Sequence, residues 1–274
     1  MIIRLIITIC LFVGTSLSWI DYGLFANPRS TVYFYNPETN INNFASLKSE
    51  FDEYLSHHGP FQFQPFSDRD TFEKFIIESN DGVFILSSWH FHDLFVKFPI
   101  DSVCVGTSKG KSTQKKILSL NGITTNDNFD LLMGKKVASA GNEEYTRNVI
   151  KQMLGEEKAH LVDCLKILRV PKEIDALMAL GFGMADLAIT SENSLSKLAI
   201  LNPKQYKGLR LIAKSNETLL PILATPKHRN DNIDLLLTVI EKMGTNPEGV
   251  TKLKMLGIDG WKRLGKIEKT SLED

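Results

Sequence analysis

Apolar runs typical of strands alternate with segments that have helical spacing in the first third of the chain. Residues 31–35 and 82–86 are short β-rich or apolar runs, the first of which stops at Asn36-Pro37. Between them, residues 44–55 repeat apolar positions every three or four residues, as the buried face of a helix does. This alternation predicts βαβ units, that is, a mostly parallel sheet covered by helices on both faces.

The middle of the chain predicts a second α/β unit. Its expected strands and helices are, in order, strand 103–106, strand 113–120, strand 134–138, helix 143–154, strand 160–164, helix 171–180 with Pro171 in its first turn, strand 184–189 and strand 209–213. Strand 219–225 and helix 231–243 then return to the first unit. We therefore expect two lobes joined by a two-strand hinge, one of residues 19–105 and 213–274 and the other of residues 106–212.

Loops at the carboxyl ends of parallel strands line the ligand crevice of such sheets. In the first lobe these loops are residues 35–40 and 87–92, and in the second lobe residues 190–193. Their candidate ligand-binding residues are Tyr35, Asn36, Ser87, Ser88, Trp89, Ser191 and Glu192. Packing inside the lobe is the alternative role for Tyr35 and Trp89, and capping of a helix is the alternative for Ser191.

The first eighteen residues have the layout of a secretory signal peptide. A positively charged start at Arg4 precedes an apolar run, and Ser16 and Ser18 stand at −3 and −1 of a cut before Trp19. The run is shorter than the ~20 residues of a membrane-spanning helix, so a retained anchor is the weaker alternative. We expect residues 1–18 to be a cleaved signal and the protein to be periplasmic.

Composition describes an ordinary globular chain with no bulk electrostatic attraction. Of 274 residues, 43% are apolar and 23% charged, and 32 basic residues balance 32 acidic ones. Nothing in this balance attracts nucleic acid. Cys10 lies inside the predicted signal. Cys104 and Cys164 are both flanked by apolar residues, so we expect buried free thiols, with a disulfide as the alternative.

Two local patterns suggest other chemistry. Residues 106–110 match G-x-S-x-G, which would make Ser108 the nucleophile of a hydrolase, but that motif requires a helix directly after it and a strand is predicted there. His90, His92 and Asp93 suggest a metal, but their helix would splay them and zinc takes three or four convergent ligands. We expect no metal, no cofactor and no catalysis.

Four segments in this order resemble the phosphate/phosphonate-type periplasmic substrate-binding proteins of ABC transporters. They are residues 82–88 (GVFILSS), 131–138 (LLMGKKVA), 174–188 (IDALMALGFGMADLA) and 246–260, which starts NPEG and ends LGIDG. The resemblance spans nearly all of the chain after the predicted signal. It implies a type II periplasmic-binding-protein fold, with a ligand in the interlobe cleft and closure on binding.

One stretch departs from this resemblance. The family's anion-binding helix start is rich in Ser and Thr, whereas residues 141–147 here read GNEEYTR. Tyr145, Thr146 and Arg147 are the candidates that remain. Two acidic residues, Glu143 and Glu144, occupy the first turn, where a helix would otherwise favour an anion. These two carboxylates either serve only to stabilise the helix, or they change which ligand the site binds.

These observations predict an exported monomer that binds a small polar solute, with oxyanion- or phosphonate-like ligands among the candidates, and delivers it to a membrane permease. The alternative is a periplasmic protein of the same fold that reports its ligand state to a membrane sensor. A secreted serine hydrolase using Ser108 is the remote third hypothesis.

Overall fold

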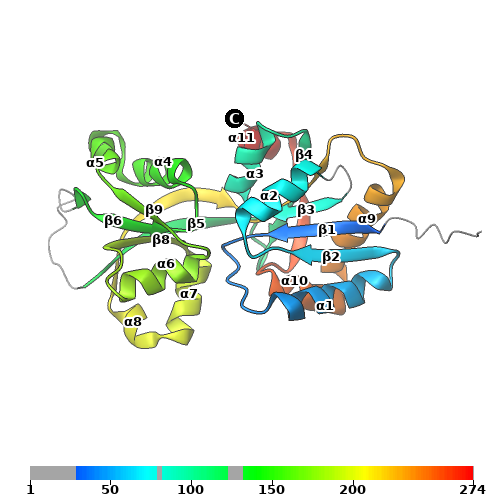
Figure 1. Cartoon of the computed structure of the whole chain (residues 1–274), viewed down its shortest axis with the longest axis horizontal. Helices are drawn as coiled ribbons and strands as arrows, with labels where there is room; N and C mark the ends of the chain where they lie inside the picture. Colours follow the sequence, from blue (N-terminus) through cyan, green and yellow to red (C-terminus); the bar gives the residue numbers. More distant parts are fainter. Residues whose placement is uncertain (1–28, 79–81, 123–131, 274) are drawn as a thin grey trace, which may run out of the picture.

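Two β-sheets organise the chain into two lobes, which lie side by side in the computed structural model (Figure 1). The structure describes residues 29–78, 82–122 and 132–273, so the predicted signal peptide and Cys10 lie outside the described residues. Among the described residues, no helix has the length and apolar character needed to cross a bilayer.

The sheet of lobe 1 has the strand order β11-β4-β10-β3-β1-β2. Its strands are β1 (Ser30–Tyr35), β2 (Phe61–Pro65), β3 (Val83–Leu86), β4 (Ile100–Thr107), β10 (Ile222–Pro226) and β11 (Gly260–Arg263). One face packs on α1 (Phe44–Ser56), α9 (Asp231–Lys242), the short 3₁₀ turn Met243–Thr245 and α10 (Pro247–Met255). The other face packs on α2 (Arg69–Glu78), α3 (Ser88–Phe95) and α11 (Lys266–Glu273).

Lobe 2 repeats this three-layer arrangement around the strand order β7-β6-β8-β5-β9. Its strands are β5 (Thr113–Asn121), β6 (Lys136–Ser139), β7 (Lys166–Arg169), β8 (Leu187–Ser191) and β9 (Leu209–Leu219). One face packs on α6 (Glu173–Gly181) and α7 (Glu192–Leu201), with α8 (Pro203–Lys207) beyond them. The other face packs on α4 (Glu143–Leu154), after which come the 3₁₀ turn Glu156–Lys158 and α5 (Ala159–Asp163).

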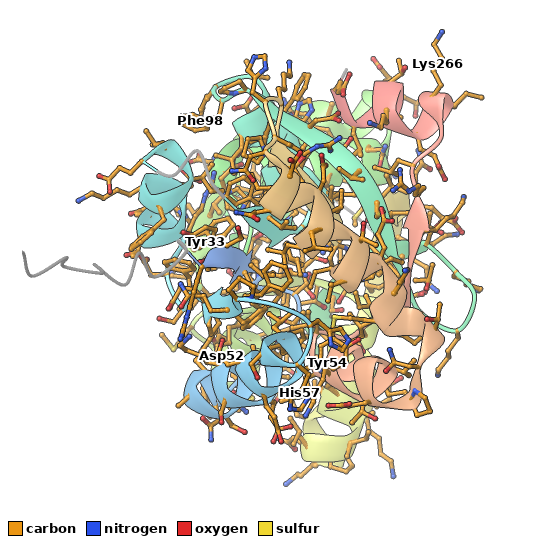
Figure 2. The ribbon with its side chains drawn as sticks, turned by 90° about the vertical axis from the view of Figure 1, so that its right-hand side faces the viewer. Tyr33, Asp52, Tyr54, His57, Phe98 and Lys266 are labelled. Carbon is orange, nitrogen blue, oxygen red and sulfur yellow. The ribbon has the colours of Figure 1, made fainter. Side chains whose placement is uncertain are left out.

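Figure 2 looks at lobe 1 from its end and shows α1 and α10 together at its lower edge. The labelled Tyr54 lies at this contact, where Asn246 Nδ2 donates to Tyr54 Oη at 3.1 Å. Deeper in the same layer, the rings of Phe51 and Phe63 stack with centroids 4.2 Å apart. Burial of such apolar rings holds the helical layer on the sheet.

Both sheets are mixed rather than mostly parallel. Parallel pairs join β1 to β2 and β3, and join β6 to β7 and β8, as the βαβ rhythm predicts. The strands next to the crossings between lobes pair antiparallel.

The chain changes sheets twice, between β4 and β5 and between β9 and β10. The two crossings are bonded to each other, since Leu220 N donates to Ser112 O at 2.9 Å and Gly106 N donates to Pro221 O at 2.8 Å. They form the two-strand hinge. The expected boundaries at 105/106 and 212/213 fall within β4 and β9, and the division of the chain at those residues remains a proposal.

Three further sequence predictions differ from the structure. Residues 160–164 form most of α5 and its end instead of a strand, because five residues are too few to separate the two periodicities. The helix expected from Pro171 begins at Glu173, after an extended Lys172. Cys104 is buried, but Cys164 lies exposed at the end of α5; both are free thiols.

Candidate functional site

The two lobes face each other through the carboxyl ends of their parallel strands. Lobe 1 contributes residues 36–43 after β1 and the start of α3 after β3, and lobe 2 contributes the segments that follow β6, β7 and β8. These are the positions where α/β sheets bind ligands. The resulting interlobe cleft is therefore the candidate site.

Lys116 of β5 lies at the centre of the cleft between two carboxylates. Its Nζ is 2.6 Å from Glu38 of lobe 1 and 2.7 Å from Glu173 of lobe 2. The side chains of all three residues are at most 9% exposed. Gln114 donates to the second oxygen of Glu38, and Ser191 donates to the second oxygen of Glu173 through both its backbone N–H, at 2.8 Å, and its Oγ, at 2.6 Å.

The charges of this cluster follow from its burial and its pairing. Burial by itself would lower the pKa of Lys116, but attraction to Glu173 and Glu38 outweighs burial and raises it, so the amine stays protonated. Burial raises the pKa of Glu38, which shares the single ammonium with Glu173. Burial also raises the pKa of the Tyr145 phenol beside them, which therefore stays neutral.

Two aromatic rings meet across the cleft next to this cluster. Trp89 of α3 stacks on Tyr145 of α4, with ring centroids 5.1 Å apart and an interplanar angle of 25°. The Arg69 guanidinium also lies over the Trp89 ring, at 5.1 Å, and pairs with Asp93 at 3.0 Å. Asn142, at the start of α4, donates to the same carboxylate. This side of the cleft is thus closed by contacts between the lobes.

The loop after β1 closes the opposite side. Asn40 Oδ1 accepts from Ile174 N at 2.9 Å, in the first turn of α6, whose own N-cap Lys172 makes no side-chain capping bond. Asn40 Nδ2 donates to Ser194 Oγ at 3.0 Å. Lys197 Nζ donates to Thr39 O at 2.7 Å. A residue of lobe 1 therefore caps a helix of lobe 2.

Two of the spaces in the cleft adjoin Tyr145, one narrow and one larger. The space around Lys116 measures only about 10 Å³. Beside it lies a cavity of about 330 Å³, whose lining includes Ser88, Trp89, Tyr145, Asn148, Glu217 and Leu219. Besides Tyr145, its charged or titratable lining residues are Asp93, Glu144, Glu217 and His92. Because Asp93 is paired with Arg69, the acidic character of the larger cavity comes from Glu144 and Glu217, and two aromatic rings form part of its wall.

Of the residues predicted in lobe 1, Ser88 and Trp89 line the larger cavity. Ser88 Oγ donates to Leu219 O at 2.9 Å, which ties α3 to the hinge strand. Tyr35 is buried against the rings of Phe72 and His90, and burial raises the pKa of Tyr35 to about 12.

Asn36 and Ser87 have structural positions within their own loops. Asn36 is buried in the turn after β1, where its Oδ1 accepts from Glu38 N at 3.0 Å. Ser87 is buried at the N-cap of α3 without a side-chain capping bond.

The residues predicted in lobe 2 divide in the same way. Tyr145 lines both spaces, and Ser191 contacts Glu173. Thr146 is buried and donates to Asn142 O at 2.6 Å, inside its own helix turn. Arg147 pairs with Glu143 at 2.7 Å and donates to the carbonyl oxygens at the end of α5, away from the cleft. Glu192 is exposed and lies 3.8 Å from Lys214.

Several residues of the cleft were not predicted, among them Lys116, Glu38, Glu173 and Asn40. Glu38 and Asn40 stand in the loop that the carboxyl-end rule selects, so that rule could have included them. Lys116 follows Lys115 in a strand and has the pattern of an exposed position. Nothing in its local sequence distinguishes it.

The two alternative chemistries gain no support from geometry. Ser108 sits in a tight turn, bonded to Lys111 and followed by β5, whereas a nucleophile elbow leads into a helix. His90 Nε2 bonds to Glu73 at 2.9 Å and His92 Nδ1 to Leu272 O at 3.1 Å. No group of three potential metal ligands occurs within the described ranges.

Solved structures share the whole architecture. A binding-protein component of an ABC phosphonate transporter from Pseudomonas aeruginosa superposes with a TM-score of 0.73 at 14% identity, covering 89% of this chain and 84% of that one. PhnD1 from Prochlorococcus marinus in complex with methylphosphonate gives 0.68 at 11% identity, with 89% and 96% covered. Tv2483 bound to L-arginine gives 0.55 at 14% identity, with 85% and 92% covered.

These similarities define the class of fold. The chain has the two-lobed type II periplasmic-binding-protein fold, as its sequence predicted. No family model matches the sequence, and no curated protein matches it either. Proteins that share this fold hold ligands as different as methylphosphonate and L-arginine.

Proposed function

We propose that this protein captures a small solute between its lobes, in the cavity beside Trp89 and Tyr145. The observation that carries this proposal is the origin of the cavity walls. Trp89 comes from lobe 1, Tyr145 from lobe 2 and Glu217 from hinge strand β9. A cavity built from both lobes forms only when they close. Its volume of about 330 Å³ suits a small molecule.

The solute that fits this lining is neutral or cationic. Glu144 and Glu217 line the cavity together with Asp93, whose charge is paired with Arg69, and among its described lining residues there is neither Lys nor Arg. An oxyanion placed there would meet like charges, while an ammonium or guanidinium group would be attracted to the carboxylates and to the aromatic faces. We therefore propose a polar amine in place of the phosphonate-like ligand that the family resemblance suggested.

The partner that suits such a protein is a membrane permease. We propose that the chain is exported by the predicted signal, residues 1–18, and delivers its solute in the closed form. A permease that contacts both lobes at once requires them in fixed relative positions, which the closed form provides.

A thermal-denaturation panel tests the proposed solute class. The purified protein is heated with amines, amino acids, organic acids, phosphate and phosphonates. A true ligand at one hundred times its dissociation constant adds ~2.7 kcal/mol, which raises the melting temperature by roughly 5–10 °C for a chain of this size. We expect the shift with an amine and none with phosphonate.

Two neighbouring residues supply a matched pair for this panel. Glu144 lines the cavity, while Glu143 in the same helical turn is 63% exposed and pairs with Arg147. Glu144→Gln should weaken binding of the amine several-fold, and Glu143→Gln should leave binding unchanged. A melting shift with phosphonate alone, or equal effects of the two substitutions, contradicts the proposed solute class.

A further inference from the structure

The centre of the cleft is filled by the protein itself. The space around Lys116 and Glu38 measures about 10 Å³, which is at or below the size that holds a single water molecule. Lys116 is only 3% exposed, and a lysine buried to this extent is rarely found without a charged partner. A solute group reaches this position only when the Lys116 side chain leaves it.

The acceptors of Lys116 belong to different lobes. Glu38 follows β1 of lobe 1 and lies 78 positions away in sequence, while Glu173 begins α6 of lobe 2, the lobe that contains Lys116. The bond to Glu173 is therefore internal to lobe 2, and the bond to Glu38 crosses the cleft. Both are charge-assisted, and such bonds are stronger than neutral ones.

The remaining oxygens of both carboxylates are held in position. Gln114 donates to Glu38. Ser191 and Ser194 donate to Glu173 through their Oγ atoms, at 2.6 Å and 2.7 Å. This is a built polar site with a charged group seated in it, rather than a chance contact of surface chains. Opening of the cleft would separate both Lys116 and Gln114 of β5 from Glu38, and it would leave the contacts of Glu173 with Lys116, Ser191 and Ser194 intact.

We propose that Lys116 is a resident occupant of the cleft, whose ammonium group closes the two lobes on each other in the absence of solute. The Lys116 side chain bonds to both lobes at once, as a bound ligand does in a two-lobed binding protein. This inference goes beyond the proposed function and does not depend on which solute the larger cavity accepts.

We call the Lys116 ammonium, bonded to Glu38 and Glu173, the latch. It makes distinct predictions for its two carboxylates. Glu38→Gln removes the charge that attracts Lys116 across the cleft and leaves the Lys116–Glu173 pair inside lobe 2. The lobes should then open while lobe 2 remains folded. Glu173→Gln keeps the bond that crosses the cleft, so it should destabilise lobe 2 more than it opens the cleft.

Small-angle X-ray scattering of the solute-free protein tests the latch, with the radius of gyration as the readout. The wild type should be compact, and Lys116→Ala should give a larger radius. Because alanine keeps Cβ, n-propylammonium matches the atoms removed and should restore the compact form. The neutral 1-propanol and the anionic propionate should not restore it.

Lys135→Ala is the matched control variant. Lys135 pairs with Asp186 at 3.0 Å, but both side chains are more than 40% exposed and both lie in lobe 2. This substitution should not change the radius of gyration. Circular dichroism checks that each variant is folded, and if Lys116→Ala fails to fold, Glu38→Gln decides the question.

Two results would overturn the latch: a solute-free wild type that is already open, or Lys116→Ala and Glu38→Gln variants that are as compact as the wild type. Neither result bears on the solute panel, because scattering is measured without solute. Conversely, a panel without any melting shift would count against the proposed function and leave the latch standing.

Discussion

At the scale of single residues, Glu73 of α2 shows how pairing sets the charge of a half-buried group. It accepts from Arg69 Nε at 2.5 Å and from His90 Nε2 at 2.9 Å. Burial would raise its pKa, but the bonds from His90 and Arg69 outweigh burial and lower the pKa to about 2. His90 itself is completely buried, and burial lowers its pKa, so the imidazole stays neutral at pH 7.

This depressed pKa predicts an acid-dependent loss of stability. The folded state holds Glu73 ionised more firmly than the unfolded chain does, so its stabilisation is complete above pH ~4.5 and disappears as the pH falls towards 2. Urea denaturation between pH 2 and pH 7 should therefore show a smaller fall in unfolding free energy for Glu73→Gln than for the wild type. Glu78→Gln, an exposed position of the same helix, is the control and should retain the full fall.

At the scale of elements, helices α4 and α9 both begin with an asparagine N-cap, but only α4 begins at the cleft. Asn142 Oδ1 accepts from Tyr145 N at 2.6 Å, and Asn230 Oδ1 accepts from Ile233 N at 2.9 Å. Each is an N-cap that satisfies an otherwise unpaired helical N–H. Only Asn142 also donates across the cleft, to Asp93. The Asn230 cap thus affects only its own helix, whereas the Asn142 cap also contributes to the relative position of the lobes.

Alanine at the two caps should separate these roles. Asn142→Ala and Asn230→Ala should each lower the unfolding free energy by about 1 kcal/mol, measured by chemical denaturation. Asn142→Ala should in addition increase the radius of gyration of the solute-free protein, whereas Asn230→Ala should not. An equal scattering profile for both variants would mean that the bond to Asp93 contributes nothing to closure.

At the scale of the whole molecule, closure depends on contacts scattered along the chain. The Lys116 latch, the Trp89–Tyr145 stack and the Asn40 cap on α6 lie on different sides of one cleft. Both lobes keep their own cores, since each hydrophobic cluster belongs to one sheet and its helices. The lobes can therefore separate as rigid bodies about the hinge without unfolding.

Trp89 should report this motion by its fluorescence. It is 7% exposed in the closed form, because Tyr145 covers it from the other lobe. In Glu38→Gln we expect its emission to shift to the red and its quenching by acrylamide to rise. Trp89→Phe introduced into the Glu38→Gln variant should abolish the red shift if the shift comes from the cleft. A red shift that persists in that double variant would assign it to another tryptophan.

Much of the fold could be predicted because the responsible patterns are local. The helix expected at residues 143–154 is α4 with identical ends, since a cap at Asn142 and a period of 3.6 lie within one short stretch. The strands near residues 31 and 83 are also present, in parallel register. The carboxyl-end rule then selected Ser88 and Trp89, which line the cavity, without knowledge of the partner lobe.

Sequence alone determined most of the elements, the two-lobed fold and the edge of each sheet where the candidate site lies, because apolar periodicity and turn residues act over a few positions. Only the tertiary structure decided what fills the cleft. Lys116, Glu38 and Glu173 are separated by 57 and 78 positions, and each has the local pattern of a solvated charge. Arg147 and Glu192 stand beside the helix starts that the rule selects, yet Arg147 bonds to Glu143 and to the end of α5, and Glu192 is exposed near Lys214. A charge is buried or exposed according to its neighbours in space, and the sequence around it does not record them.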